Sequence, residues 1–329
     1  MANPKDPSYL ASMRDNRSTD KDQPKRTVLV TGAGRGLGLA IARSLDAIED
    51  IQLVLAVRDV AAAEVVTRTF RRAPRIVGLD LTSLDAVAHF TAAWREPLWG
   101  LVNNAGVQLT GPTSLTRDGF EETIAVNHLA ATWLALGLLP SLRGGRAIAI
   151  GSATHDPTSW ATRFGFRGGR FTSIDALARG DGDGDTDRQR GLDRYATSKL
   201  LAMTTMMELA RRHSSTTFIT LDPGLMPGTG LLRSGPWYAR FAWRTVMRWL
   251  VPLVPGASTP KRSAAAARRL LTEDVRSGEV YDFRARPSTQ VWAPAREPAL
   301  AAAIVDQTIA LLQPRWPISA VSSAKSATL

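Results

Sequence analysis

The sequence has 329 residues, of which 44% are hydrophobic and 22% charged, with a formal net charge of +11 and no cysteine. A chain of this length can bury a substantial core in one large α/β domain or two smaller ones. The lack of cysteine excludes disulfides and thiolate metal sites.

The basic residues are spread along the chain, with only local doublets such as Arg71-Arg72 and Arg268-Arg269. A nucleic-acid-binding chain would gather its positive charge on one surface with exposed aromatic residues. No nucleic-acid partner is therefore expected. Compositional bias or general solubility accounts for the charge, and attraction of anionic ligands or a membrane surface is the alternative.

The two ends of the chain are polar and lack periodicity. Residues 1–25 are predicted to be a disordered lead-in, and residues 314–329 a loose tail. No apolar run reaches the ~18 residues that a membrane span needs, and the first residues lack the apolar region of a signal peptide. A cytoplasmic location is therefore expected, with a peripheral membrane contact left open.

A strand, a glycine-rich turn and a helix open the folded part. Thr27–Val30 is predicted to be a buried strand, and an amphipathic helix runs to about Asp46. Glycines between them let the backbone approach a pyrophosphate, and the helix N-terminus offers free N–H groups. The pattern predicts a dinucleotide site made of Thr31, Gly32, Gly34, Arg35, Gly36, Leu37 and Gly38.

The end of the second predicted strand, Gln52–Val57, bears on the choice of cofactor. An acidic residue at this place binds the 2′-hydroxyl of NAD, and a basic one accommodates the 2′-phosphate of NADP. Arg58 comes first, and Arg35 lies in the glycine loop, so NADP(H) is expected rather than NAD(H). Asp59 follows directly, and Arg58 could alternatively begin a solvated helix.

Two further strand ends contribute candidate cofactor residues. A helix predicted to reach about Arg72 and a strand at 75–79 precede Asp80-Leu81. Asp80 is expected either to accept a hydrogen bond from an adenine amino group or to cap the helix that starts near Ser83. The fourth strand at 101–103 exits into small residues that allow a close approach of a ligand. These are Asn104, Ala105 and Gly106.

A long helix is predicted from Arg117 to about Leu139, with Asn127 in its middle. Asparagine is a mediocre helix former, so Asn127 is either tolerated there or retained to hold water. The fifth predicted strand runs from Arg146 to Gly151, and Ser152 stands at its end. The alternation of strand and helix predicts an α/β fold, a doubly wound parallel sheet of about seven strands flanked by helices, with its site at the carboxyl ends of the strands.

Residues 153–193 break this alternation and are predicted to be an enlarged, flexible, exposed loop. The aspartates at 181–187 suggest calcium, but Thr186 stands where the calcium loop needs glycine and Leu192 where it needs glutamate. No metal is expected.

Tyr195 and Lys199 lie four residues apart on the next predicted helix, so they share one face. An ammonium one turn from a phenol favours the phenolate and lowers the tyrosine pKa. Such a tyrosine exchanges protons near neutral pH. The alternative is an ordinary surface pair.

A sixth strand, Thr217–Leu221, leads to the turn Asp222-Pro223-Gly224, and aromatic residues including Trp237 gather at 231–254. They form either a packed helical cap or an apolar lid at 225–256, over a hydrophobic substrate or against a membrane. The predicted fold is completed by helices near 260–273 and 298–312 and by a strand near 279–283.

Five features stand in one order: the glycine loop, Asn103-Asn104-Ala105-Gly106, Asn127, Ser152, and Tyr195 with Lys199. In this order they resemble the short-chain dehydrogenase/reductase superfamily over residues 25–285. Ala56–Asp59 and Val126–Leu129 resemble the branch of retinol dehydrogenases and light-dependent protochlorophyllide reductases. The resemblance implies one Rossmann-type domain over residues 26–313 and, as is common in the superfamily, a homo-oligomer.

The resemblance also implies catalytic roles. Tyr195 is the general acid or base, and Lys199 lowers its pKa and binds the nicotinamide ribose. Ser152 donates a hydrogen bond to the reacting oxygen, and Asn127 holds a water that relays protons.

Pro223, Gly224 and Thr229 belong beside the nicotinamide, although the usual threonine position falls on Gly228. His155 and Trp237 are candidates for the substrate pocket, His155 alternatively being an exposed loop histidine. The substrate is expected to be an apolar carbonyl or alcohol. Reduction of a conjugated double bond, as in a protochlorophyllide reductase, is an alternative; the lack of cysteine counts against it, because the site of those reductases usually includes one. A non-catalytic cofactor-binding protein is another alternative.

Overall fold

The computed structural model describes residues 26–181, 184–226 and 256–314. Seven strands form one parallel sheet in the order β3-β2-β1-β4-β5-β6-β7. The order reverses between β1 and β4, the place where open α/β sheets bind ligands. The strands are β1 (Arg26–Thr31), β2 (Ile51–Val57), β3 (Arg75–Gly78), β4 (Gly100–Asn103), β5 (Arg146–Ile150), β6 (Thr217–Leu221) and β7 (Val280–Tyr281).

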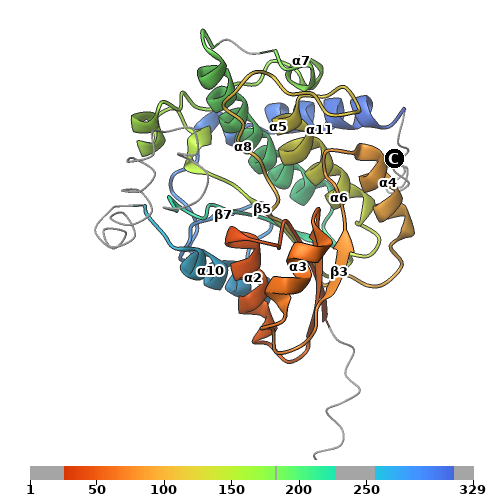
Figure 1. Ribbon diagram of the computed structural model, residues 1–329. Helices are drawn as coiled ribbons and strands as arrows, with labels where there is room; N and C mark the ends of the chain where they lie inside the picture. The colour runs from red at the N-terminus through yellow and green to blue at the C-terminus, as the bar shows by residue number, and fades with distance from the viewer. Residues whose placement is uncertain (1–25, 182–183, 227–255, 315–329) are drawn as a thin grey trace, which may run out of the picture.

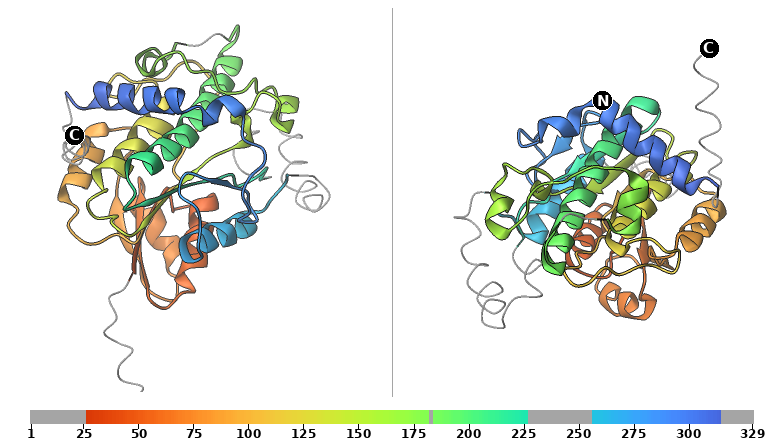
Figure 2. Two further views of the ribbon diagram at one scale, coloured as in Figure 1. Left: turned by 180° about the vertical axis from the view of Figure 1, so that it is seen from behind. Right: turned by 90° about the horizontal axis from the view of Figure 1, so that it is seen from above.

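Helices cover both faces of this sheet (Figure 1). On one side lie α2 (Gly36–Asp46), α3 (Val60–Thr67) and α10 (Pro260–Thr272). On the other lie α4 (Leu84–Ala93), α5 (Glu122–Ile124), the π-helical η2 (Ala125–Ala130), α6 (Ala131–Gly137) and α8 (Asp187–Arg212), with α11 (Pro298–Leu312) packed on α8 (Figure 2). The predicted fold class and strand number are confirmed.

The core follows the alternation of the strands. In β1, Leu29 joins the cluster under α4, α6 and α8, whereas Val28 and Val30 join the cluster under α2 and α10. Successive side chains of a strand point to opposite faces, so a central strand covered by helices on both sides is apolar throughout. The buried strand that the sequence predicts after residue 26 therefore lies at the centre of the sheet.

The long helix predicted from Arg117 starts later, at Glu122. Residues 116–120 form a turn instead, in which Gly119 has a φ of +85° and Asp118 accepts a hydrogen bond from the N–H of Leu84. The helix predicted to reach Arg72 likewise ends at Thr67. The buried carboxylate of Asp46 draws the N–H groups of Arg71 and Arg72 away from helical bonding.

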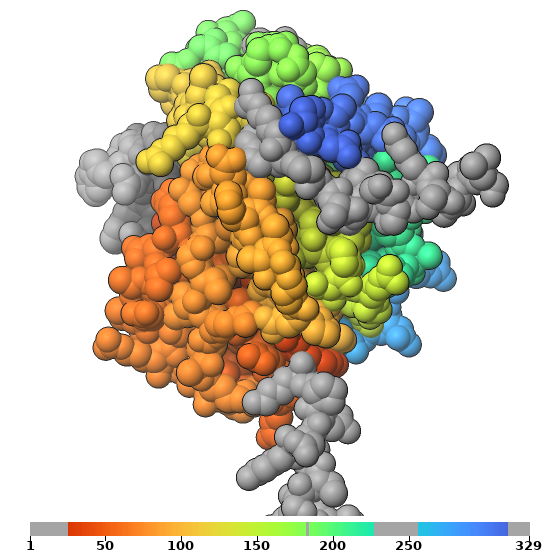
Figure 3. All heavy atoms as spheres, turned by 90° about the vertical axis from the view of Figure 1, so that its right-hand side faces the viewer, coloured from red at the N-terminus to blue at the C-terminus, as the bar shows by residue number. Residues whose placement is uncertain are grey.

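The prediction of an exposed loop at 153–193 is wrong for much of the segment. It folds into η3 (Ala153–His155), η4 (Trp160–Phe164), α7 (Ile174–Arg179) and the first turns of α8. Apolar residues of the segment, among them Ala161, Phe166 and Ile174, are buried. Figure 3 shows the green residues of this region lying against the blue α11, which contacts α7. The apolar residues of the segment are therefore packed into the fold, while many of its polar residues are exposed.

The residues predicted to be a disordered lead-in (1–25), most of those predicted to be a lid (225–256) and residues 315–329 of the predicted tail lie outside the described residues. None of the helices within the described ranges is both long and apolar enough to cross a membrane.

Gly191 lets α8 approach the chain that follows β4. A Cβ at this position would lie 2.1 Å from the carbonyl oxygen of Leu109 and 2.7 Å from Cα of Thr110. We expect Gly191→Ala to destabilise the fold by about 1–3 kcal/mol, the usual effect of overpacking. Gly111→Ala is the matched control, because no atom lies within 4 Å of its added Cβ. Equal urea unfolding midpoints for the two variants would contradict this account of the packing.

Candidate active site

Tyr195 and Lys199 lie on α8, whose N-cap Thr186 accepts a hydrogen bond from the N–H of Gln189. Lys199 is buried, and its Nζ donates a hydrogen bond of 2.8 Å to the carbonyl oxygen of Ile150 at the end of β5. The same Nζ lies 5.5 Å from the centre of the Tyr195 ring. Ser152 follows β5 after Gly151, and its hydroxyl lies near enough to the Tyr195 phenol to act on its pKa, which it lowers. The structure therefore brings these three residues together.

The ionisation of the pair differs from the prediction. Burial and, to a smaller extent, the charge of Asp222 raise the pKa of Tyr195 to about 12, although the nearby Ser152 hydroxyl acts to lower it. Burial lowers the pKa of Lys199 to about 8, which Asp222 opposes. Removing charge from water disfavours the phenolate and the ammonium alike. In this structure the lysine therefore does not lower the tyrosine pKa, because burial dominates.

Asp222 is a charged group of the site that the sequence analysis treated only as part of a turn. It follows β6, and its Oδ1 accepts a hydrogen bond of 2.9 Å from the N–H of Gly224. Burial raises its pKa, while Gly224, His155 and Lys199 act to lower it. Its place at the carboxyl end of an inner strand of the parallel sheet is the signal that could have identified it.

Asn127 lies in the π-helical η2, a kind of segment often found at functional sites. Its Oδ1 accepts from the N–H of Val107 at 2.7 Å, and its Nδ2 donates to the carbonyl of Val107 and to Oγ of Ser198. Ser198 Oγ in turn donates to the Tyr195 carbonyl. Both amide hydrogens are thus used, so this side chain could meet a water only through the second lone pair of Oδ1.

The glycine loop is fixed to the end of β4 by Thr31. Its hydroxyl accepts hydrogen bonds of 3.0 Å from the N–H groups of Asn104 and Ala105. Gly32 has a φ of +63°, and a Cβ there would lie 2.9 Å from Cα of Ala105. Gly38 has no room either, because its Cβ would lie 2.4 Å from Nδ2 of Asn104. Close contact between two loops at the switch point therefore requires these glycines.

The remaining residues of the predicted glycine loop lie around the start of α2. Leu37 is buried in the core, while Arg35 is the exposed N-cap residue. Gly36 has a φ of +58° and, like Gly34, has open space where a Cβ would stand, with the nearest atom to Gly34 at 3.8 Å. The N-terminus of α2 is thus open to a ligand.

Arg58 is exposed and has no hydrogen bond or ion pair to any residue within the described ranges. Asp59 caps α3, because its Oδ1 accepts a hydrogen bond of 2.9 Å from the N–H of Ala62. The Asp59 carboxylate, which complicated the choice between NAD and NADP, is therefore used to cap α3. Arg58 directly precedes this helix cap, which agrees with the alternative prediction that it begins a solvated helix.

Asp80 does not cap α4, whose N-cap is Ser83. Its Oδ1 accepts hydrogen bonds from the N–H and the hydroxyl of Thr82 instead. Leu81 is buried in the core. Asp80 lies just after β3, at the carboxyl edge of the sheet. Its predicted hydrogen bond with an adenine amino group therefore stays a prediction.

His155 is only 1% exposed, so it is not an exposed loop residue, and its place in the substrate pocket stays a prediction. The N–H of Trp292 donates to Nε2, which must therefore be unprotonated, and Nδ1 then donates to the carbonyl of Ser152 at 2.7 Å. His155 holds the backbone of Ser152. Pro223 and Gly224 follow β6, Gly224 with a φ of +71°, while Thr229 and Trp237 lie outside the described residues.

Comparison with known families gives one matching model, that of the short chain dehydrogenases, over residues 26–161. Protochlorophyllide reductase of Pisum sativum is 35% identical over 255 residues, which cover 69% of this chain and 62% of that protein. That of Avena sativa is 35% identical over 234 residues, covering 63% of this chain and 73% of that protein. The chain therefore spans less than two thirds of the length of the Pisum sativum relative.

Solved structures have the same fold. An uncharacterised protein from Mycobacterium Paratuberculosis superimposes with a TM-score of 0.63 at 25% identity, covering 88% of this chain and 95% of that one. A short chain dehydrogenase from Burkholderia cenocepacia, in complex with NADP, gives 0.57 at 23% identity, covering 79% and 96%.

The buried ammonium of Lys199 should make stability depend on pH. Its pKa is about 8 in the folded protein and 10.5 in the unfolded chain, so the unfolded chain binds more protons between these values. The free energy of unfolding should therefore rise with pH across this window, by about 1.4 kcal/mol per pH unit from this group. Lys199→Met should lose that rise, as measured by urea unfolding from pH 7 to 10. The same slope in both proteins would contradict the burial of the charge.

Proposed function

Because this chain belongs to the short-chain dehydrogenase/reductase family, in the branch that includes relatives of the protochlorophyllide reductases, we propose that it is an NADP(H)-dependent oxidoreductase. The reaction is hydride transfer between the nicotinamide and a carbonyl or alcohol of an apolar small molecule. One observation carries the proposal: the Tyr195 phenol, the Ser152 hydroxyl and the buried Lys199 ammonium meet at the carboxyl edge of the sheet, beside the switch point.

The residues at the switch point suit NADP(H). The open positions at Gly34 and Gly36 leave room for a pyrophosphate at the N-terminus of α2. Arg35 and Arg58 are both exposed, and each can supply a planar, bidentate donor set for a 2′-phosphate. The cofactor, once bound, supplies or accepts the hydride.

The protein then handles the proton. With a pKa of about 12, Tyr195 keeps its proton at neutral pH and can give it to an alkoxide developing on the substrate. Ser152 donates a second hydrogen bond to the same oxygen, and Lys199, mostly protonated at pH 7, supplies positive charge nearby. A tyrosine that holds its proton is in the form that the reduction of a carbonyl requires.

Aromatic residues support an apolar substrate. Phe166 lies 6.1 Å from the Tyr195 ring, centre to centre, and Trp160 meets Phe164 edge to face at 5.8 Å. Trp160 and Phe164 also pack on Leu225 and Ala257. These side chains come from the folded segment after β5, and they form an apolar wall on the Tyr195 side of the site.

Reduction of a conjugated double bond is the second candidate. It is favoured by the protochlorophyllide reductases, which are 35% identical to this chain, whereas the absence of cysteine argues against it. A product analysis with an α,β-unsaturated ketone separates the two reactions, since one yields the allylic alcohol and the other the saturated ketone. The cytoplasmic location and the homo-oligomer stay predictions.

Tyr195→Phe removes the proton donor and keeps the ring. We expect NADPH consumption with a panel of apolar carbonyl compounds to fall by about 10²–10⁴-fold, the usual contribution of general acid catalysis. NADPH binding, followed by fluorescence, should remain. Turnover that survives in this variant would exclude Tyr195 as the acid. Binding without turnover in the unaltered protein would instead favour a non-catalytic, cofactor-binding role.

Arg58→Asp tests the cofactor. Placing a carboxylate where a 2′-phosphate is expected should weaken NADPH binding about tenfold or more relative to NADH, because an ion pair becomes a repulsion. Arg143→Asp is the matched control, since Arg143 is also exposed and the change in net charge is the same. If both variants keep the original ratio of the two affinities, Arg58 does not contact the phosphate.

A further inference from the structure

Tyr195 lies on α8 between two sides of the helix that are covered by different parts of the chain. Successive residues of an α-helix are rotated by about 100°. Gly191 and Arg194 therefore lie on one side of Tyr195. Leu192 and Ala196 lie on its other side, where they pack with the aromatic residues of the segment after β5. That side is the apolar wall of the proposed substrate site.

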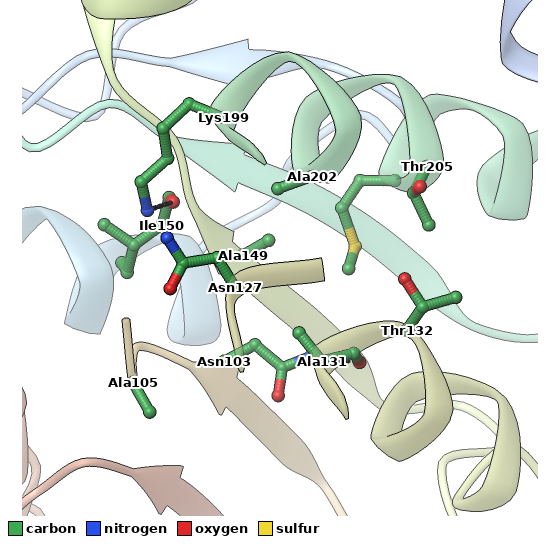
Figure 4. A pocket seen from close by; sticks show the side chains of 11 residues that line it. Asn103, Ala105, Asn127, Ala131, Thr132, Ala149, Ile150, Lys199, Ala202 and Thr205 are labelled. Carbon is green, nitrogen blue, oxygen red and sulfur yellow. Dashed lines mark hydrogen bonds between the residues drawn. The ribbon is translucent and has the colours of Figure 1, made fainter. Parts of the chain in front are cut away.

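The chain that follows β4 starts beside the reacting groups. An added Cβ at Gly106 would lie 3.9 Å from Nζ of Lys199. Ala105, just before it, lines a small cavity together with Asn127 and Lys199 (Figure 4). None of residues 107–113 is buried, so their side chains are accessible to a molecule bound at the phenol.

Residues 107–113 contact α8 at two places. The carbonyl oxygen of Leu109 packs on Gly191, where a Cβ would lie only 2.1 Å from it. At the end of the segment, Nη1 of Arg194 donates a hydrogen bond of 2.7 Å to Oγ1 of Thr113. Both contacts are on the side of α8 away from the apolar wall. The segment therefore stands opposite that wall, across the helix turn that carries the phenol.

Arg194 makes its contact from a buried position, together with a buried carboxylate. The side chains of Arg194 and Glu121 are 3% and 1% exposed, and Nε of the arginine lies 3.4 Å from Oε1 of the glutamate. Neither of these two atoms has a hydrogen-bond partner among the residues that the structure describes. A buried ion pair contributes little net stability compared with apolar residues of the same size. What it provides here is a fixed geometry between the elements that carry the two charges.

Glu121 is fixed independently of Arg194. Its Oε2 caps α5 by accepting a hydrogen bond of 2.8 Å from the N–H of Ile124, and its own N–H donates to the carbonyl of Ala178 in α7 at 2.7 Å. A bridge between Leu115 and Glu121 closes the turn between these two residues. The guanidinium therefore joins α8 to a turn that is already held in place, and residues 107–113 lead into this turn.

We propose that Arg194 is a positioning residue that holds residues 107–113 as the second wall of the substrate pocket. The inference rests on the proposed function and adds that the substrate lies over Tyr195, between this wall and the aromatic one. Because packed contacts hold both walls, the space between them is fixed, and it determines how wide a substrate can bind. Val107 and Leu109 make the second wall suitable for an apolar molecule.

Thr113→Val tests the contact without disturbing the buried charges. Thr113 is exposed, so the variant should fold, but Arg194 loses its acceptor. The backbone amides of residues 107–113 should then exchange with deuterium about tenfold faster, the effect expected for loss of a hydrogen bond to a charged group. Thr113→Ser should restore the slow exchange. The control is Thr69→Val, since Thr69 is also exposed and its hydroxyl bonds only the carbonyl of Val66.

A second variant removes the buried pair itself. Arg194→Met alone would leave the Glu121 carboxylate buried and unpaired, so it is combined with Glu121→Gln, whose amide oxygen can still cap α5. The double variant should keep most of its stability to urea, because neutral replacement of a buried pair is often not destabilising. It should nevertheless show the same faster exchange at residues 107–113.

Kinetics with a narrow and a wide apolar ketone, cyclohexanone and 2-decalone, test the role in substrate binding. In Thr113→Val and in the double variant, KM for the wide ketone should change about five- to tenfold, with kcat changed less than about threefold and NADPH affinity unchanged, because the reacting groups are intact. KM for the narrow ketone should change much less.

The outcomes separate the two parts of the inference from the proposed function. Unchanged exchange at residues 107–113 in both variants overturns the positioning role of Arg194, whether or not any ketone is reduced. Faster exchange with equal changes of KM for the two ketones overturns the second wall. Absence of turnover in the unaltered protein contradicts the proposed function instead, and the exchange rates of the variants still decide whether Arg194 holds the segment.

Discussion

The hydrogen bond from Lys199 to the carbonyl of Ile150 joins the two elements on which the site depends. It ties α8, which carries the tyrosine, to β5, which delivers Ser152. An ammonium is hard to bury, so this contact is stable only if its remaining donors are also satisfied. The surroundings supply Asp222 and the polar cavity behind the lysine. The same burial holds the proton on Tyr195.

The rest of the fold makes this burial achievable. Gly191 brings the start of α8 against residues 109–110, and α11 covers the helix from outside. The segment after β5 closes the remaining side with Phe166 next to Tyr195, and His155 within it fixes the carbonyl of Ser152. What the sequence presents as an interruption between Ser152 and Tyr195 is thus the packing that lets two residues 43 positions apart meet. The same segment supplies the apolar wall of the proposed substrate site.

The sheet was predictable because its signals are local. Continuous apolar runs such as Thr27–Val30, followed by glycine turns, specify buried parallel strands with little help from distant residues. The failures have distant causes. Asp46 ends α3 from 25 residues away, and Asp118 caps a helix 34 residues earlier. The burial of 153–193 depends on contacts with α8 and α11 that its glycine-rich composition conceals.

The candidate site likewise has residues that the sequence predicts and properties that depend on the folded structure. The order of Ser152, Tyr195 and Lys199 could be recognised from motifs, and the structure brings them together. The direction of the tyrosine pKa could not be predicted from spacing, because the i, i+4 relation gives proximity but not burial. The role of Asp222 could not be predicted for the same reason. Its effect depends on burial at the place where the ends of β5 and β6 meet α8.

The central claim is that this edge of the sheet transfers a hydride, and the fate of the hydrogen tests it most directly. The protein should be given NADPH carrying two deuterium atoms at C4 of the nicotinamide, together with an apolar ketone that it consumes, and the product analysed by mass spectrometry and NMR. The account predicts one deuterium on the carbinol carbon of the product alcohol. An alcohol without that deuterium, or no reduced product from any compound of an apolar carbonyl panel while NADPH stays bound, would contradict it.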